Sequence, residues 1–349
     1  MTRIRTCAQP FVFCFIGVCM LMFASVVAGA RDAEAVYVEG WPELRSGSGV
    51  LDDLFFGDRV RSGESVITGR GDRAELELDD GSSIVVREDT VFTMREVDEN
   101  GQSRSAFSNT RGSVTYSLDG IRGRSSRIQS ANATVGVRGT TFTVFAGDDG
   151  GSLFVVDSGR IAVEAQGEEV ELGENEAVEV NAGEAPGEPF EVLRGELDFS
   201  GWNNGRVNAV LDNPVAAAEG ALRRLEEIVA ELEEAIAEYE PLREELMEAY
   251  EEERRVYREE GEEALEEFRE EVLRPLQFST PRRYINVRYW ALSALNMRRY
   301  VFGRMYTIVR SNHVLQPDHP DVVGYREVHE RALALFEDHV TPWLVVYDI

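Results

Sequence analysis

The sequence predicts a two-domain protein in which an all-β domain precedes an α-helical, coiled-coil-like bundle. Short stretches of alternating polar and apolar residues, separated by Gly, Asp and Asn, fill the first half of the chain. From Pro214 onward the apolar residues recur with a helical period instead. The predicted boundaries are a signal peptide at 1–30, the β domain at 31–190, a linker at 191–212 and the helical domain at 213–349.

The amino terminus has the pattern of a secretory signal peptide. Arg3 and Arg5 precede an almost wholly apolar run from Phe11 to Val27, and an A-G-A tripeptide ends at Ala30. This order of charged, apolar and small residues predicts cleavage after Ala30. The mature protein would then be periplasmic or secreted and would have no stable membrane span. The apolar run is long for a signal peptide, so an uncleaved anchor is the alternative.

Composition excludes several kinds of chemistry. The three cysteines, Cys7, Cys14 and Cys19, all lie within the predicted signal peptide, so the mature chain has no disulfide and no thiolate metal ligand. All 36 basic residues are Arg, which excludes Schiff-base, P-loop and Ser-Lys mechanisms. A net charge of -28 argues against nucleic acid as a partner, because its phosphates would be repelled.

The β domain is predicted from residues 64–96 and from a second set at 142–163. Apolar residues alternate with polar ones on either side of Asp80-Gly81, a dipeptide typical of tight hairpin turns. Many short strands with such turns favour a sandwich, a barrel or a short solenoid.

Two segments carry a family resemblance. Residues 130–144, SANATVGVRGTTFTV, and residues 55–86, FFGDRVRSGESVITGRGDRAELELDDGSSIVV, contain four ordered sub-patterns. In this order they resemble the FecR-type periplasmic domain, over about residues 36–180. The resemblance implies an all-β, FecR-like domain that binds or signals, without catalysis and without a cofactor.

The hallmark segment supplies the candidate site. Among the residues that match the family pattern, we expect Gly136, Val137, Gly139 and Phe142 to shape the fold. Arg138, Thr140 and Thr141 are the candidate binding residues. Gly136 and Gly139 bracket Arg138, which predicts a bulge or corner that aims its guanidinium in a fixed direction. The alternative is that Arg138 is a structural strut.

The start of the chain departs from the plan of FecR proteins. Those proteins relay a signal from an outer-membrane receptor, through one membrane span, to a cytoplasmic sigma factor. Here only about ten residues precede the apolar run, too few for the cytoplasmic part. We therefore expect this chain to share the FecR-like domain. We expect a role in sigma-factor regulation only if a partner protein supplies the connection. We expect that partner to be an envelope protein or a cell-wall component; self-association through the helical domain is a further alternative.

The helical domain is predicted to contain about four helices. The first ends at Pro241, the second spans about 242–273, and the last covers about 320–340. Between them, residues 281–310 contain seven Arg and no Asp or Glu, whereas the two preceding helices are rich in Glu. This charge separation predicts an intramolecular bundle. Contact with anionic lipid or a cell-wall polymer is the alternative.

The four histidines, His313, His319, His329 and His339, lie in the last part of the chain. Their spacing places no pair one helical turn apart, and no H-E-x-x-H motif is present. We therefore expect solvated histidines and no metal site. An envelope enzyme or metal-binding protein that uses these residues with Asp318 is the alternative function, and a cell-wall-binding scaffold is another.

Export is directly testable. Amino-terminal sequencing of the protein from its native envelope fraction should return Arg31 as the first residue, because all three parts of the signal agree. Recovery of intact Met1 in the membrane pellet would contradict this prediction and support the anchored alternative.

Overall fold

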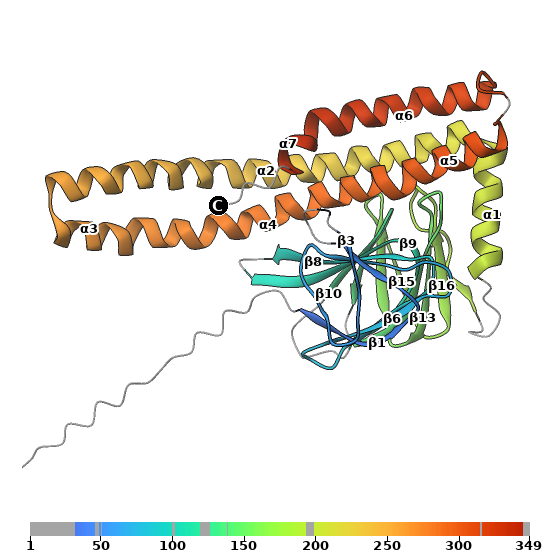
Figure 1. The fold of residues 1–349 in the computed structure, drawn as a ribbon, viewed down its shortest axis with the longest axis horizontal. Helices are drawn as coiled ribbons and strands as arrows, with labels where there is room; N and C mark the ends of the chain where they lie inside the picture. Colours follow the sequence, from blue (N-terminus) through green and yellow to red (C-terminus); the bar gives the residue numbers. More distant parts are fainter. Residues whose placement is uncertain are drawn as a thin grey trace, which may run out of the picture.

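The computed structural model describes residues 32–45, 49, 51–99, 102–118, 126–137, 139–192, 199–314 and 316–344. The predicted signal peptide and Arg138 lie outside the described residues. Within them a strand-rich region is followed by a helical region, so the predicted order is confirmed (Figure 1). None of the described helices is both long and apolar enough to cross a membrane.

The β domain forms two sheets that are continuous through one long strand, β9. The strands are β1 (Ala33–Glu39), β2 (Glu43–Arg45), β3 (Leu51–Asp53), β4 (Arg59–Val60), β5 (Ser65–Ile67), β6 (Arg73–Leu78), β7 (Ser83–Val86), β8 (Val91–Glu99), β9 (Gln102–Leu118), β10 (Ser126–Ser130), β11 (Thr134–Val137), β12 (Thr140–Ala146), β13 (Ser152–Ser158), β14 (Ile161–Ala165), β15 (Glu168–Leu172), β16 (Glu176–Val180) and β17 (Phe190–Glu191). The expected Asp80-Gly81 hairpin joins β6 to β7, and Gly81 has a φ of 82°.

Strand β9 bends between the two sheets. Its first half pairs with β8 and β10, and the half after Arg111 pairs with β7 and β12. We call the sheet that contains β7 and β12 the first sheet and the one that contains β8 and β10 the second sheet. Inward residues of both sheets share one buried apolar core, in which Tyr116 of the first sheet packs near Phe107 of the second.

Gly112 lies at this bend and is the residue that the geometry constrains most clearly. Its φ is 84°, and a Cβ there would lie 2.6 Å from the Cα of Thr90 and 2.7 Å from the carbonyl oxygen of Asp89. Backbone atoms cannot move aside as a flexible side chain can. Both the positive φ and the close approach therefore require glycine.

The helices are α1 (Phe199–Asp212), α2 (Pro214–Glu259), α3 (Glu262–Phe268), α4 (Arg274–Asn296), α5 (Gly303–Asn312), α6 (Pro320–His339) and α7 (Thr341–Leu344). Two π-helical segments, Arg269–Leu273 and Met297–Phe302, join α3 to α4 and α4 to α5. Asn213 caps α2 and Pro214 opens it, as the sequence indicates.

Three expectations for this region were wrong in detail. Helix α2 continues through Pro241, and the chain turns back at Gly261, whose φ is 92°. The helix after this turn runs through Pro275 into α4. Pro241 is exposed, so water can satisfy the carbonyl that it leaves without a partner. The predicted linker contains α1, a helix of 14 residues.

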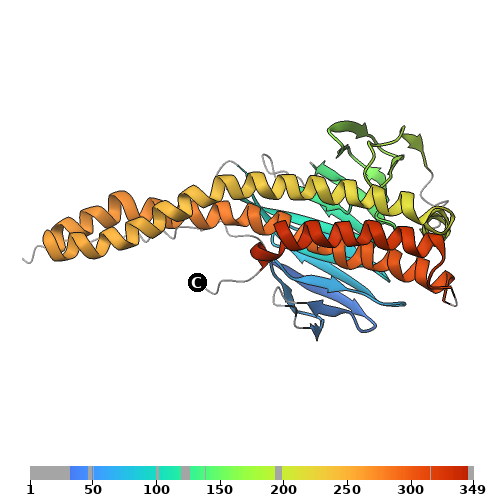
Figure 2. The ribbon, with the colours of Figure 1, turned by 90° about the horizontal axis from the view of Figure 1, so that it is seen from above.

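The helices form a bundle over the β domain and an arm beyond it. Helix α2 lies antiparallel to α4, and α6 packs along the first part of α2 (Figures 1 and 2). The outer part of the α2–α4 hairpin, residues 240–280, extends past the β domain without α6; we call it the helical arm. The Arg- and aromatic-rich segment buries Met297, Val301 and Met305 in the bundle core.

The bundle packs directly on the β domain. A Cβ on Gly220 of α2 would lie 2.6 Å from the carbonyl oxygen of Ala182, and one on Gly183 would lie 2.4 Å from the carbonyl oxygen of Gly220. Such close approach of two backbones leaves no room for a side chain at either position.

The bend in β9 yields a matched pair of variants. Gly112→Ala should lower the free energy of unfolding by about 2 kcal/mol or more, since both strain and overlap arise. Gly136→Ala should have little effect, because its Cβ would meet nothing within 4 Å and its φ is not positive. Urea denaturation measures both; equal stability of the two variants would contradict the constraint at Gly112.

Candidate functional site

The hallmark segment mainly builds the fold. Phe142 is fully buried and stacks on Tyr116 with ring centroids 5.2 Å apart, and Val137 is buried in the same core. Gly139 has a φ of 63°, which fits the predicted corner. Gly136 is an exposed strand residue without such a constraint.

The two candidate threonines differ in their surroundings. Thr140 is buried, and its hydroxyl donates to the carbonyl oxygen of Arg160 at 2.8 Å. Thr141 points to the opposite face of β12, where its hydroxyl lies 3.1 Å from that of Ser117. Thr141 thus belongs to the outer face of the first sheet. A ligand contact at Arg138, Thr140 or Thr141 stays a prediction.

The same outer face continues into an open groove of about 570 Å³. Thr143, two residues after Thr141, contributes to its lining, and Phe145 and Phe199 supply apolar surface. Its charged lining residues are Glu39, Asp72, Arg73, Arg87, Glu88 and Asp157. The volume is within the range of small-molecule sites. Apolar walls with charges of both signs suit a ligand or peptide segment that carries both polar and apolar groups.

The interface between the two domains contains a fully buried cation, Arg95 of β8. Its guanidinium donates to the side-chain oxygen of Gln129 at 3.3 Å and to the carbonyl oxygens of Tyr289 and Leu292 at 3.2 and 3.3 Å. It also donates to Ser293 and lies over the Tyr289 ring. Among the described residues no carboxylate forms an ion pair with Arg95, and none contributes to the shift of its pKa. Burial therefore lowers its pKa to about 10.

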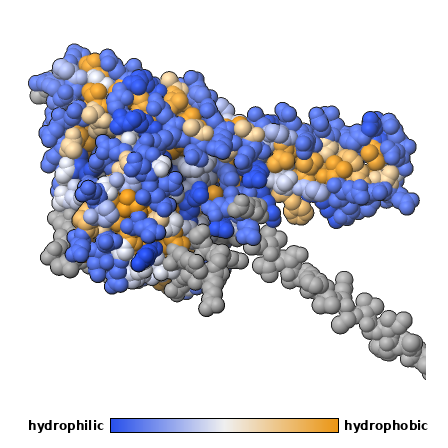
Figure 3. Space-filling model, turned by 180° about the vertical axis from the view of Figure 1, so that it is seen from behind, coloured by the Kyte–Doolittle hydropathy of each residue, from blue (hydrophilic) through white to orange (hydrophobic). Residues whose placement is uncertain are grey.

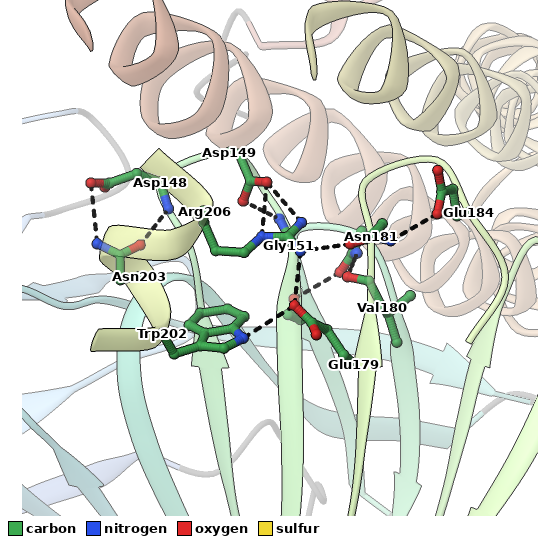
Figure 4. Close-up of polar contacts among 12 residues, drawn as sticks. Asp148, Asp149, Gly151, Glu179, Val180, Asn181, Glu184, Trp202, Asn203 and Arg206 are labelled. Carbon is green, nitrogen blue, oxygen red and sulfur yellow. Dashed lines mark hydrogen bonds and ion pairs between the residues drawn. The ribbon is translucent and has the colours of Figure 1, made fainter. Parts of the chain in front are cut away.

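A second polar network joins the β12–β13 turn to α1 (Figure 4). Arg206 of α1 forms ion pairs with Asp149 at 2.7 Å and with Glu179 at 2.8 Å. The indole nitrogen of Trp202 donates to Glu179 at 3.1 Å. Burial opposes the charged form of Arg206, but its two carboxylate partners raise its pKa above the ordinary value.

Asp148 extends this network to the bundle. Its carboxylate pairs with Arg111 of β9 at 3.0 Å and with Arg304 of α5 at 3.1 Å, and its backbone N–H donates to Asn203. Burial opposes ionisation of Asp148, yet the hydrogen bond and charge of Arg304, together with the charge of Arg111, hold its pKa below the ordinary value. One buried carboxylate thus connects the β domain, α1 and α5.

The helical arm carries exposed apolar side chains on an acidic background. Met247, Tyr257 and Phe278 are 58%, 59% and 67% exposed. Residues 240–280 contain 15 Glu and 6 Arg, a net charge of −9. Figure 3 shows apolar surface along the arm, bordered by hydrophilic residues.

The histidines are not uniformly solvated, contrary to the expectation. His329 stacks on Phe302 in a cluster of rings, where burial and then the charge of Arg298 lower its pKa. His339 pairs with Glu233 at 2.7 Å. His313 and His319 come together beside Asp321.

Sequence reasoning missed Arg95, Asp148 and Arg206. The GDDGG segment indicates a turn, but nothing in it points to an arginine about 55 residues later. Phe92 and Met94 of β8 face the core of the β domain, whereas Arg95 lies on the opposite face of the strand, against α4. A charged residue on that face is ordinary for a strand with one solvated side, so the sequence gives no sign that Arg95 is buried.

One family model matches a part of the β domain. Residues 64–162 match the family model described as FecR protein, in line with the resemblance that the sequence motifs indicate. No curated protein matches the chain. Two crystal structures named "putative anti-sigma factor", from Parabacteroides distasonis, at 2.50 and 1.65 Å resolution, are similar at 18% identity with a TM-score of 0.32. The match covers 37% of this chain and 59% of each of those chains.

The buried carboxylate predicts a pH effect. The pKa of Asp148 is lower in the folded protein than in the unfolded chain. Ionised Asp148 therefore stabilises the fold at every pH above the unfolded-state pKa. This stabilisation is lost as the pH falls through the folded-state pKa. Asp148→Asn should cost about 1–3 kcal/mol at neutral pH, because Arg111 and Arg304 lose their partner. The difference in the free energy of unfolding between this variant and the parent should become smaller at acid pH.

The exposed Glu168 provides the control. Glu168→Gln should leave stability within about 0.5 kcal/mol at each pH. Urea denaturation of both variants from pH 7 to pH 3 measures the effect; an Asp148→Asn deficit that does not change with pH would contradict the assignment.

Proposed function

We propose that this protein is an exported, non-catalytic binding protein of the cell envelope that takes part in signalling or scaffolding. Its FecR domain supports a regulatory role. The close packing of the bundle on the β domain supports a single platform that presents surfaces to other proteins. The observation that carries this proposal is the helical arm, which extends past the domain that supports it.

The arm fits a partner protein with a basic surface that contains an apolar strip. Tyr257 and Phe278 would supply the apolar contacts, since exposed aromatic side chains contribute strongly to binding. The net charge of the arm would attract a basic partner and speed association. A second copy of this chain would bring two arms of the same charge together, so self-association through the arm is disfavoured at low salt.

The groove on the first sheet supports a second candidate function, the binding of a small ligand or of an extended peptide. Its two arginines, Arg73 and Arg87, are cations in a strongly acidic chain and would orient an anionic group. Thr141 stays a predicted contact on this face, and Arg138 and Thr140 stay predicted binding residues. A cell-wall component or an envelope protein would fit such a face, and a role towards a sigma factor would require a membrane-spanning partner.

The arm is testable by replacing its aromatic side chains. Tyr257→Ser with Phe278→Ser should abolish cross-linking of the mature protein to its partner in the native envelope fraction, because the apolar contacts are lost. The helix content should not change, since both side chains are largely exposed. Cross-linking followed by mass spectrometry, with circular dichroism, measures both.

Trp41 and Phe56, each 74% exposed on the β domain, provide the matched control. Trp41→Ser with Phe56→Ser should retain the cross-link. Loss of the cross-link in this control but not in the arm variant would place the contact on the β domain and contradict the role of the arm.

A further inference from the structure

The loop between α5 and α6 brings two histidines and one aspartate together. His313 follows α5 directly, His319 caps α6, and Asp321 lies in the first turn of α6. One potential ligand atom of each side chain lies within 4.8 Å of those of the other two. His319 follows His313 by six positions, so only the reversal of the chain between the two helices places them side by side.

The distances suit a divalent transition metal. Nε2 of His313 lies 3.6 Å from Oδ2 of Asp321, and Nδ1 of His319 lies 3.4 Å from the same oxygen. Ligands about 2.0–2.1 Å from a tetrahedral zinc ion are roughly 3.3–3.4 Å apart. Both pairs are therefore close to the separation that one shared ion requires. Imidazole and carboxylate are ligands that such metals prefer.

The two imidazoles are partly buried and lie next to each other before any ion binds. The side chain of His313 is only 15% exposed, and that of His319 is 31% exposed. Pro317 and Pro320 flank His319 and limit the conformations of the loop. This arrangement lowers the conformational entropy that a flexible pair of histidines would lose on binding.

We propose that His313, His319 and Asp321 form a binding site for a divalent transition metal, with zinc the best match. Three protein ligands leave the fourth tetrahedral position to water or to a partner side chain. The ion would connect the end of α5 to the start of α6 and so stabilise the far end of the bundle. This site does not depend on the arm or on the groove.

Binding requires two small rearrangements. The imidazole rings are stacked with centroids 3.9 Å apart, so at least one ring must rotate to aim its nitrogen at a shared ion. The χ2 angle of histidine is broad, so this rotation costs little. Nδ1 of His319 also accepts a weak hydrogen bond of 3.3 Å from the N–H of Asp321, which the ion would replace. The positive end of α6 opposes a cation, and the Asp321 carboxylate offsets that charge.

The experiment uses the mature protein, purified without a histidine tag and treated with a chelator. Titration with Co²⁺ should give saturable visible absorption of a tetrahedral site at one equivalent, and Zn²⁺ should displace it. Isothermal titration with Zn²⁺ should give the same stoichiometry, and the melting temperature should rise with Zn²⁺ concentration. Affinity should fall in acid, because imidazole binds metal only when it is neutral.

His313→Gln, His319→Gln and Asp321→Asn should each weaken Zn²⁺ binding by at least about tenfold, since each removes one of three ligands. His339→Gln is the matched control, because His339 also pairs with a carboxylate but lies at the other end of α6. His339→Gln should bind Zn²⁺ with the same affinity as the parent protein. Circular dichroism without metal should show that all four variants keep the parent helix content.

Three results would overturn the proposal. They are the absence of one-equivalent binding by the parent, binding that His313→Gln and His319→Gln leave unchanged, and an equal loss in His339→Gln. If a histidine variant fails to fold, the result for Asp321→Asn decides the test, because this variant retains both histidines and the volume of the side chain. Unchanged Zn²⁺ binding by Asp321→Asn would then overturn the proposal.

Discussion

The arrangement of this molecule depends on a buried cation between its two domains. Arg95 lies on the second sheet, and its guanidinium donates to Gln129 of the sheet and to α4 backbone carbonyls at Tyr289 and Leu292. A buried charge is costly unless polar groups surround it, and here neutral oxygens take the place of a carboxylate. These oxygens converge only when α4 is docked on β8. The cation therefore favours one relative position of the domains, which apolar packing alone would specify less sharply.

Other contacts extend this docking along the interface. Asp148 connects β9, α1 and α5, and Arg206 fixes α1 against Asp149 and Glu179. At the Gly183–Gly220 contact the two backbones meet without intervening side chains. The helices thus form a cover for one side of the β domain and leave the outer face of the first sheet with its groove open. Because the bundle is fixed, the arm projects in one defined direction, which is what a surface for a protein partner requires.

The same fixed bundle explains how a loop can hold a metal-binding set. His313 and His319 come together because α5 and α6 pack side by side, with the ring cluster of Phe302, Tyr306, Tyr325 and His329 between them. A metal there would act on the end of the bundle farthest from the arm. Binding at the arm, ligand binding in the groove and metal stabilisation would then use three separate parts of one molecule.

The sequence by itself determined the order of the domains, the hairpin at Asp80-Gly81, the start of α2 at Pro214 and the FecR resemblance. The first three rest on local rules: the alternation of a strand, the φ of a turn and the capping of a helix. The resemblance rests on the order of four sequence motifs. Local rules were wrong at Pro241, because the packing of a 46-residue helix outweighs the cost of one exposed proline. Only the tertiary structure decided which distant residues meet. Arg95 with α4, Asp148 with Arg304 and His313 with His319 depend on how helices and sheets pack, and spacing along the chain carries no information about that packing.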